Sequence, residues 1–530
     1  MDGSIKAGEV DTRQGFTLPG IDFSELIALA LSLAAVLAAY LVADRIYDRI
    51  PHIEDEIAYV WQARAMAAGA VTAPTPPLEN RFLVPFVVDH EGLRFGKYPL
   101  GWPALLSVGI RLGLRAWVNP LLGGLAVWLT YVLGRRLLGR PAGLIAAVLT
   151  ATSPFFLMIS GSLLSHALGL VLALAFVLAW WDVVGPREGA GSPEAGRLPG
   201  WIPVLAAGGA IGALAVTRPF TAAGAALPFV VQAIVLFVRG PGALRRRFAG
   251  VALIGALIGS LHLLWQAAAA GDPFFNLYTL WWPYDRAGFG PGFGVTDQGH
   301  NLNLAWINTA YSLRVGWHDL FGWPGFSWIL LPFGVWAVRR DGRTLLAGSV
   351  APVLLVFYGA YWVGSWTYGP RYQYEGLFSL ALLSAAGLCL LAGWPLRPGE
   401  RDSARQGAAR LRPLLAAGLF AALLAVNLAM YLPVRLDSMR ALYGISGAAL
   451  APFEAAEGSL APAVVIVHAD HWTGYGALLD LQDPFLTSPF IFMWGAPRGI
   501  HATLADYFPG RAIFHYYPEE PRVFYTGPRP

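Results

Sequence analysis

Residues 27–40 read IALALSLAAVLAAY, a run without a single charged side chain. Comparable apolar windows follow at residues 121–133 and 414–432. A helix that crosses the hydrocarbon core of a bilayer needs roughly 20 predominantly apolar residues. Because that core holds no water to bond exposed amide groups, such windows must be helical. These windows therefore predict an all-α polytopic membrane protein.

The rest of the chain has the same character, since 56% of its 530 residues are hydrophobic and 13% are charged. One apolar stretch could be a signal peptide, but a long series cannot. The net charge of +4 comes from basic residues scattered through short loops, which argues against a nucleic-acid partner. The single cysteine, Cys389, excludes an intrachain disulfide. We expect about eleven spans, near residues 24–43, 117–134, 141–159, 163–181, 201–217, 219–238, 249–269, 323–338, 345–363, 374–394 and 414–432.

The loops between these spans predict an orientation in the plasma or inner membrane. Arginine-rich short loops belong in the cytoplasm by the positive-inside rule; they lie at residues 135–140, 187–197, 239–247, 339–343 and 397–412. Longer aromatic loops at 44–116 and 270–322 then face outside. This orientation divides the chain into a cytoplasmic segment (1–23), a transmembrane domain (24–432) and an extracytoplasmic C-terminal domain (433–530). We expect the last to be a small α/β domain, because residues 463–468 and 511–517 read as strands.

The first external loop begins with a helix signal at residues 51–69, PHIEDEIAYVWQARAMAAG. Pro51 stands near the first turn and Gly69 just past the end, as is usual for helices. The acidic triplet at 54–56 lies where the helix dipole stabilises carboxylates by a few tenths of a kcal/mol up to about 1 kcal/mol. That stabilisation alone would account for the triplet. The helix is too short and polar to span, so we expect an external juxtamembrane helix on the membrane surface.

Four short motifs follow one another on the predicted outer side, namely Asp55-Glu56, Lys97-Tyr98-Pro99, Thr217-Arg218-Pro219 and Gly369-Pro370-Arg371-Tyr372. In this order they resemble the GT-C superfamily of glycosyltransferases, and within it the protein O-mannosyltransferase and aminoarabinose-transferase branch. The resemblance covers the first ten predicted spans. Each motif alone is weak. The usual second proline after Lys-Pro is absent, with Tyr98 intervening after Lys97, and the C-terminal tail matches nothing in the family.

The resemblance implies a membrane glycosyltransferase that moves a hexosyl or pentosyl unit from a polyprenyl-phosphate donor on the extracytoplasmic face. The acceptor would be a protein, a lipid or a cell-envelope glycan. Asp55 would be the general base that takes the proton of the acceptor hydroxyl, a role that contributes roughly 10²–10⁴-fold. Glu56 would orient Asp55 or a bound cation. Direct attack would invert the anomeric carbon, and Glu54, about 100° round the helix, should point elsewhere.

The phosphate that leaves the donor needs positive charge nearby. Arg218 is the first candidate, because it lies between two spans on the predicted outer side, where an unpaired charge is costly. The alternative is that Arg218 snorkels to lipid headgroups. Lys97 and Arg371 are further candidates, and for Lys97 the alternative is a solvated loop position.

Other side chains are candidates for binding substrate. Tyr59 lies one turn after Asp55 on the same helix face. His166 begins a span, although a lone intramembrane histidine often only bonds a neighbouring helix; the same holds for His262. A glycine-rich loop can bend closely around a ligand, and the loop at 281–300 adds Trp282, Tyr284, Asp285 and His300. Its aromatic side chains could equally be interfacial anchors.

A divalent metal ion is the one cofactor that the sequence leaves open. Its candidate ligands are Asp297, His300, His318 and Asp319, and in the tail His468, Asp470 and His471. Their spacing fits no standard zinc pattern, and loop positions without a metal are the plainer interpretation.

Two other functions compete with the enzyme. A transporter or flippase of a lipid-linked substrate would show repeated halves and charged residues near the midplane. The sequence has no internal repeat, and its distinctive residues collect on one predicted side, which favours an enzyme. A non-catalytic protein that binds a glycolipid in the same pocket is a third hypothesis, because an acidic pair can persist without activity.

Overall fold

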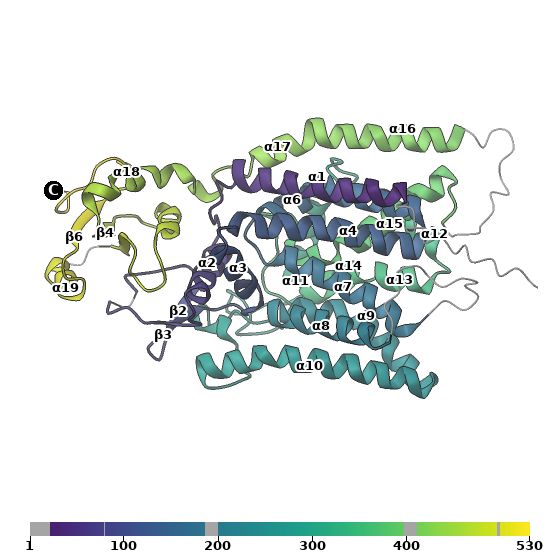
Figure 1. Ribbon diagram of the computed structural model, residues 1–530, viewed down its shortest axis with the longest axis horizontal. Helices are drawn as coiled ribbons and strands as arrows, with labels where there is room; N and C mark the ends of the chain where they lie inside the picture. Colours follow the sequence, from purple (N-terminus) through teal and green to yellow (C-terminus); the bar gives the residue numbers. More distant parts are fainter. Residues whose placement is uncertain (1–21, 79, 186–199, 397–410, 496–498, 530) are drawn as a thin grey trace, which may run out of the picture.

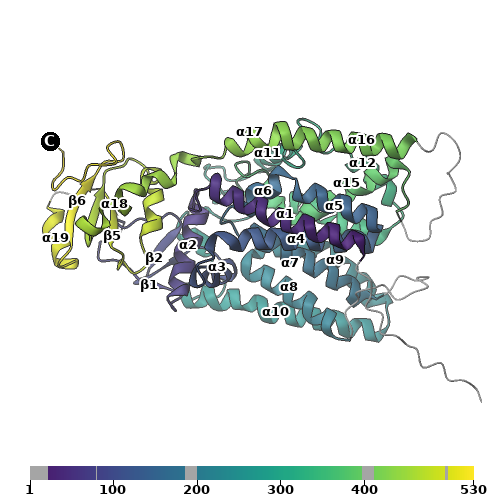
Figure 2. The ribbon, with the colours of Figure 1, turned by 45° about the horizontal axis from the view of Figure 1, so that its top comes forward.

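Helices dominate the protein and strands occupy one end of it (Figures 1 and 2). The computed structural model describes residues 22–529 except 79, 186–199, 397–410 and 496–498. The predicted N-terminal segment, and most of the arginine-rich loops at 187–197 and 397–412, lie outside the described residues.

In chain order the helices are α1 (Phe23–Arg45), α2 (Glu54–Ala67), α3 (Gly101–Arg111), η1 (Arg115–Trp117), α4 (Val118–Leu138), α5 (Arg140–Ala151), α6 (Pro154–Gly161), α7 (His166–Val184), α8 (Ile202–Thr217), α9 (Pro219–Arg239), α10 (Gly242–Ala270), η2 (Leu277–Leu280), α11 (Leu302–Asp319), α12 (Leu331–Val338), α13 (Gly342–Gly348), α14 (Val350–Tyr358), η3 (Arg371–Gly376), α15 (Leu377–Ala392), α16 (Leu411–Val426), η5 (Asn427–Tyr431), α17 (Leu432–Asp437), η6 (Leu442–Gly444), η7 (Gly447–Ala449), α18 (Ala451–Leu460), η8 (Trp472–Gly474), η9 (Gly476–Leu481) and α19 (Ile500–Tyr507). The strands are β1 (Ala73–Pro74), β2 (Val87–His90), β3 (Leu93–Gly96), β4 (Ala463–Val467), β5 (Phe490–Trp494) and β6 (Ala512–Tyr516).

The long helices make this a multi-pass membrane protein. In the part of the chain that the structure describes, seven helices are long and apolar enough to span, or eight if α5 and α6, bent by 58°, form one span. Two more apolar helices, Ile202–Thr217 and Gly342–Tyr358, are shorter. The count of about eleven is therefore not reached by length and composition. The window at 323–338 is helical only over α12, because Gly322-Trp-Pro-Gly325 interrupts it with two glycines at positive φ.

The bundle packs through small residues. On α8, Gly208 and Gly212 are one turn apart and face α10. A Cβ at Gly208 would lie 2.7 Å from the Cβ of Ile254, and one at Gly212 equally close to Ile258. Small residues at this spacing let two helix backbones approach closely in a membrane, where packing rather than apolar burial drives association. This contact fixes the axis of α8, whose C-terminal end delivers Arg218 to the site described below.

Two small sheets lie at one end of the bundle, at the left of Figure 1. The first is antiparallel with the order β1-β3-β2, and it lies beside α2 and α3. The second is parallel with the order β5-β4-β6, and it lies with α18 and α19. Strands β4 and β6 are the runs that the sequence predicted at 463–468 and 511–517.

Helix α2 is buried within the protein, which the sequence did not predict, while its position at the membrane surface stays a prediction. Its residues from Glu56 to Ala63 are all buried. One side packs on α3 and β3, and the C-terminal segment covers another side through η9. Arg64, in the last turn of α2, takes part in that contact and donates to the Asp480 carboxylate at 3.0 Å.

Asp480 joins the C-terminal segment to the first external loop, and its removal should loosen that contact. Its oxygens accept from Arg64 (3.0 Å) and Arg115 (2.6 and 2.9 Å). Although burial opposes it, these guanidinium groups lower the pKa of Asp480. Asp480→Ala leaves both arginines without their carboxylate, so we expect a loss of about 3–5 kcal/mol in the free energy of unfolding. Thermal unfolding in detergent measures it, with Asp506→Ala on exposed α19 as control. Equal midpoints for the two variants would contradict this role.

Candidate active site

One cavity of about 610 Å³ collects residues from distant parts of the chain. It lies where α2, the α8–α9 junction, the loop before α11 and the segment between α14 and η3 meet. Its wall includes eight of the residues predicted from the sequence, namely Asp55, Tyr59, Lys97, His166, Arg218, Trp282, Asp285 and Arg371. All four sequence motifs therefore contribute to a single site.

Asp55, at the start of α2, is a carboxylate with spare accepting capacity. The Tyr98 hydroxyl donates to its Oδ1 at 2.8 Å. Burial and the nearby Asp55 raise the pKa of Tyr98 well above its usual value, so the phenol stays protonated and keeps donating. The other oxygen, Oδ2, lies 3.5 Å from the Arg371 guanidinium. Since each carboxylate oxygen has two lone pairs, Asp55 can accept a further proton from a ligand in the cavity.

The two neighbours of Asp55 are placed opposite to expectation. Glu54, which was expected to point elsewhere, lines the cavity, and burial raises its pKa. Glu56 is 2% exposed and lies outside the cavity lining. Its Oε2 accepts from the His52 backbone N–H and its Oε1 from that of Leu163, both at 2.7 Å. Glu56 thus holds the start of α2 against the turn before α7, and the structure does not bring it to Asp55's oxygens.

Lys97 and Asp285 form an ion pair inside the cavity wall. Their Nζ and Oδ2 atoms are 3.0 Å apart, and the side chains are 2% and 1% exposed. Asp285 Oδ1 also accepts from the Tyr361 hydroxyl (2.6 Å) and the Trp362 indole (3.1 Å). Burial lowers the pKa of Lys97, with Asp285 opposing the effect. An ammonium has three N–H donors, so two of those on Lys97 are left for a ligand.

Aromatic rings surround the Lys97 ammonium. Its Nζ is 3.7 Å from the ring centre of Phe86 and 4.8 Å from that of Trp282. The face of an aromatic ring attracts a cation. The loop position suggested by the sequence is therefore a buried one, and the solvated-lysine alternative is wrong.

Arg218 points into the protein and does not snorkel. It lies at the non-helical junction of α8 and α9, with its side chain 13% exposed. Its Nε is 3.0 Å from Glu375 Oε1, and its Nη1 donates to Ser165 at 3.1 Å. Ser165 is also 3.3 Å from the Tyr59 hydroxyl. The arginine therefore connects the α8–α9 junction to the start of α7 and to η3.

Glu375 was missed in the sequence. It is fully buried in η3 and lies within 3.2 Å of His166 Nδ1 as well as facing Arg218. One signal could have found it: a carboxylate inside the apolar window at 374–394, where an ionisable residue is rare and usually has a partner.

Arg286 is a second residue that the sequence did not single out. It is exposed, lines the cavity and directly follows Asp285. Among the described residues no carboxylate forms an ion pair with it, unlike Lys97, Arg218 and Arg371. Its five N–H donors are therefore free for an anionic ligand.

Two predicted substrate-binding residues lie outside the cavity lining. His300 is buried, with its Nε2 2.9 Å from the Gly359 carbonyl oxygen. Tyr284 stacks on the ring of Trp282, with centroids 6.1 Å apart. Their relative position could not be derived from the sequence, because five glycines between them leave the path of this loop open.

The candidate metal ligands do not converge within the described ranges of the chain, where no group of three or more His, Cys, Asp or Glu side chains could hold an ion. Asp319 pairs with Arg435, and His318 accepts from the Gly325 N–H. In the tail, His468 contacts His515 instead of the expected Asp470 and His471. A divalent ion stays a prediction that these residues do not support.

A second cavity of about 370 Å³ lies between α11, α12, α14 and α15. Its lining is almost entirely apolar, and it contains none of the residues predicted for the site. The polar chemistry of the protein is therefore concentrated in the first cavity.

Comparison with solved structures identifies the fold. ArnT from Cupriavidus metallidurans bound to undecaprenyl phosphate matches with a TM-score of 0.56 and 16% identity, covering 92% of this chain and 89% of that chain. The apo state of the same protein matches with a TM-score of 0.56 and 15% identity, covering 91% of this chain and 88% of that chain. AglB from Archaeoglobus fulgidus, in complex with an inhibitory peptide and a dolichol phosphate, reaches 0.47 and 14%, covering 87% and 64%. No protein-family model and no curated protein sequence matches the chain.

The chain has the fold of the GT-C glycosyltransferases, so the resemblance drawn from the four motifs is confirmed at the level of the fold. Within that class it is similar to ArnT over nearly the whole length of both chains.

Glu56 should make stability depend on pH. Burial raises its pKa to about 7 from 4.5, although two backbone N–H groups oppose the shift. The stability that follows from this raised pKa is complete below pH 4.5 and is lost as the pH rises through about 7. We expect wild type to lose up to about 3 kcal/mol over this range, and Glu56→Gln to lack that component. Thermal unfolding of both proteins in detergent between pH 5 and 8 measures it; parallel curves would contradict the assignment.

Proposed function

We propose that this protein is an inverting membrane glycosyltransferase that moves a sugar from a polyprenyl-phosphate donor to an acceptor hydroxyl. The observation that carries the proposal is the cavity in which Asp55 and Arg371 lie together with Lys97, Arg218 and Arg286. A base for an acceptor and cations for a phosphate thus share one space. The similarity in fold to ArnT, which was solved with undecaprenyl phosphate bound, supports a lipid-phosphate donor.

Asp55 is the proposed general base. A hydroxyl is a poor nucleophile near neutral pH, and a positioned carboxylate that accepts its proton in the transition state corrects this. The Tyr98 hydroxyl at 2.8 Å and the Arg371 guanidinium at 3.5 Å hold Asp55 in place without filling its lone pairs. Glu56 has a positioning role at most, because both of its oxygens accept backbone N–H groups.

The cations are proposed to stabilise the phosphate as the bond to the sugar breaks. Positive groups fixed in advance near developing negative charge stabilise a transition state most effectively in a site from which water is excluded. Lys97, Arg218 and Arg371 are held by carboxylates, so they do not need to reorganise. Arg286 has its guanidinium free, and we add it to these as a phosphate ligand.

The sugar is proposed to lie among the aromatic rings of the cavity, which include Tyr59, Tyr278, Trp282 and Tyr361. His166 borders the same space. The acceptor class stays open between protein, lipid and glycan. No feature of the described residues favours a flippase, so we do not propose one.

Asp55→Asn should abolish transfer while the protein stays folded. The amide is nearly isosteric but cannot accept a proton, so we expect a loss of roughly 10²–10⁴-fold in kcat. Proteoliposomes receive radiolabelled polyprenyl-phosphate sugars and a crude envelope acceptor fraction, and label in the acceptor is counted. Asp437→Asn, which changes a carboxylate that is 76% exposed on α17, is the matched control. Full transfer by Asp55→Asn would remove this residue from the mechanism, and label that crosses the bilayer without transfer would favour a flippase.

Arg286→Gln should weaken use of the donor. Loss of a hydrogen bond to a charged group costs about 1.5–3 kcal/mol, so the KM for the donor should rise roughly 10- to 100-fold. Arg286→Lys keeps the charge without the planar fork and should be intermediate. The measurement is initial rate against donor concentration in the same proteoliposomes. An unchanged donor KM in Arg286→Gln would show that the arginine does not contact the phosphate.

A further inference from the structure

One extended part of the chain, residues 361–372, forms a large share of the cavity wall. We call it the wall segment. It carries Tyr361 and Trp362, which bond Asp285, and Arg371, which faces Asp55. It follows α14, has no helix or named strand up to residue 370, and ends in the first two residues of η3. Its position must therefore be set by contacts with other elements.

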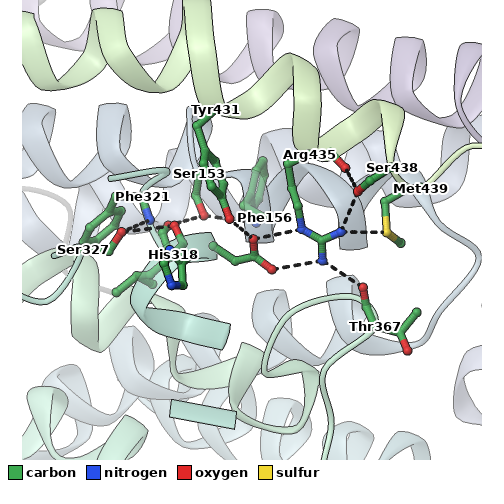
Figure 3. A network of polar contacts seen from close by, with 12 residues as sticks. Ser153, Phe156, His318, Phe321, Ser327, Thr367, Tyr431, Arg435, Ser438 and Met439 are labelled. Atoms are coloured by element: carbon green, nitrogen blue, oxygen red, sulfur yellow. Dashed lines mark hydrogen bonds and ion pairs between the residues drawn. The ribbon is translucent and has the colours of Figure 1, made fainter. Parts of the chain in front are cut away.

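A buried ion pair holds the middle of the wall segment (Figure 3). Arg435 on α17 faces Asp319 at the end of α11, with Nε–Oδ1 and Nη2–Oδ2 distances of 3.0 and 3.1 Å. The same Nη2 donates to the Thr367 carbonyl oxygen at 3.0 Å. Asp319 is 2% exposed and Arg435 20%. The arginine thus joins α11, α17 and the cavity wall at a single point.

The local shape of the last long helix makes this contact possible. A π-helical turn, η5, separates α16 from α17, and such turns rotate the side chains that follow them. Tyr431 ends this turn and precedes Arg435 by four residues, so both face the same side. The Tyr431 hydroxyl donates to Asp319 Oδ1 at 2.6 Å (Figure 3). One carboxylate therefore receives three donors from this helix.

The residues next to Thr367 are held from other sides. The Tyr368 hydroxyl is 3.4 Å from Glu56 Oε2 and the ring is fully buried. Gly369 adopts a φ of +75°, and a Cβ there would lie 2.7 Å from the Phe155 ring. Consecutive residues of the wall segment thus contact α17, α2 and α6.

We infer that Asp319 and Arg435 are positioning residues for the active site: they fix the wall segment, and with it Arg371 beside Asp55, to the helix that carries the C-terminal domain. The kinetic part of this inference rests on the function proposed above. A misplacement of about 1 Å in a positioned group can cost roughly 10²-fold in rate. Loosening the pair should therefore impair catalysis without removing any group that touches substrate.

Hydrogen–deuterium exchange of the full-length protein in detergent tests the structural part. The variants are Asp319→Asn, Arg435→Gln and Arg435→Lys, with Asp437→Asn as the matched control, because it removes an exposed carboxylate on the same α17. We expect backbone exchange in residues 361–372 to rise at least roughly tenfold in Asp319→Asn and Arg435→Gln, and less in Arg435→Lys, while α15 keeps its wild-type rates. Unchanged exchange in the wall segment, or an equal rise throughout the bundle, would overturn the inference.

Kinetics in proteoliposomes test the same variants against the proposed reaction. We expect kcat/KM for the donor to fall at least roughly tenfold in Asp319→Asn, with partial retention in Arg435→Lys and wild-type values in Asp437→Asn. Wild-type kcat/KM in Asp319→Asn would overturn the positioning role. Should wild type itself transfer no sugar, the proposed function fails, and the exchange pattern alone decides whether the pair fixes the wall segment.

Discussion

The ion pair between Arg218 and Glu375 is the contact on which the site depends. It joins the α8–α9 junction to η3 at 3.0 Å, and His166 of α7 lies 3.2 Å from the same carboxylate oxygen. Separating such a buried pair would cost about 3–5 kcal/mol, because it would leave a buried charge without a partner. Helices that are distant in the chain must therefore keep this junction closed, and the cavity has a fixed wall as a result.

The same constraint decides which groups are left to meet a substrate. Lys97 is held by Asp285, and Arg435 by Asp319, so these charges stabilise the architecture around the cavity. Bonding capacity for a ligand remains on Asp55, on two N–H donors of Lys97, and on Arg286, which has no carboxylate partner within the described ranges. In the proposed reaction, Asp55 would be the base for the acceptor hydroxyl, and Lys97 and Arg286 would face the phosphate.

Much of the site could be predicted because the motifs are local. Asp55, Lys97, Arg218 and Arg371 were selected from short patterns, and the structure brings all of them to one cavity. The errors arose where side-chain direction mattered. Glu54 and Glu56 are the same residue type, two positions apart in the first turn of α2. Glu54 nevertheless lines the cavity, whereas Glu56 accepts hydrogen bonds from two backbone N–H groups. Which carboxylate faces the cavity depends on where the Leu163 N–H lies, and that position is set by the fold.

The sequence by itself determined that the chain is helical and membrane-embedded, because hydrophobicity and the absence of water in the bilayer act on each window independently. It also determined the order of the four motifs. The tertiary structure alone decided that α2 is buried under the C-terminal segment, that α12 is too short to span, and that Arg218 pairs with Glu375. The reason is physical: apolar character is a property of a segment, whereas the partner of a buried charge is fixed by distances between segments far apart in the chain.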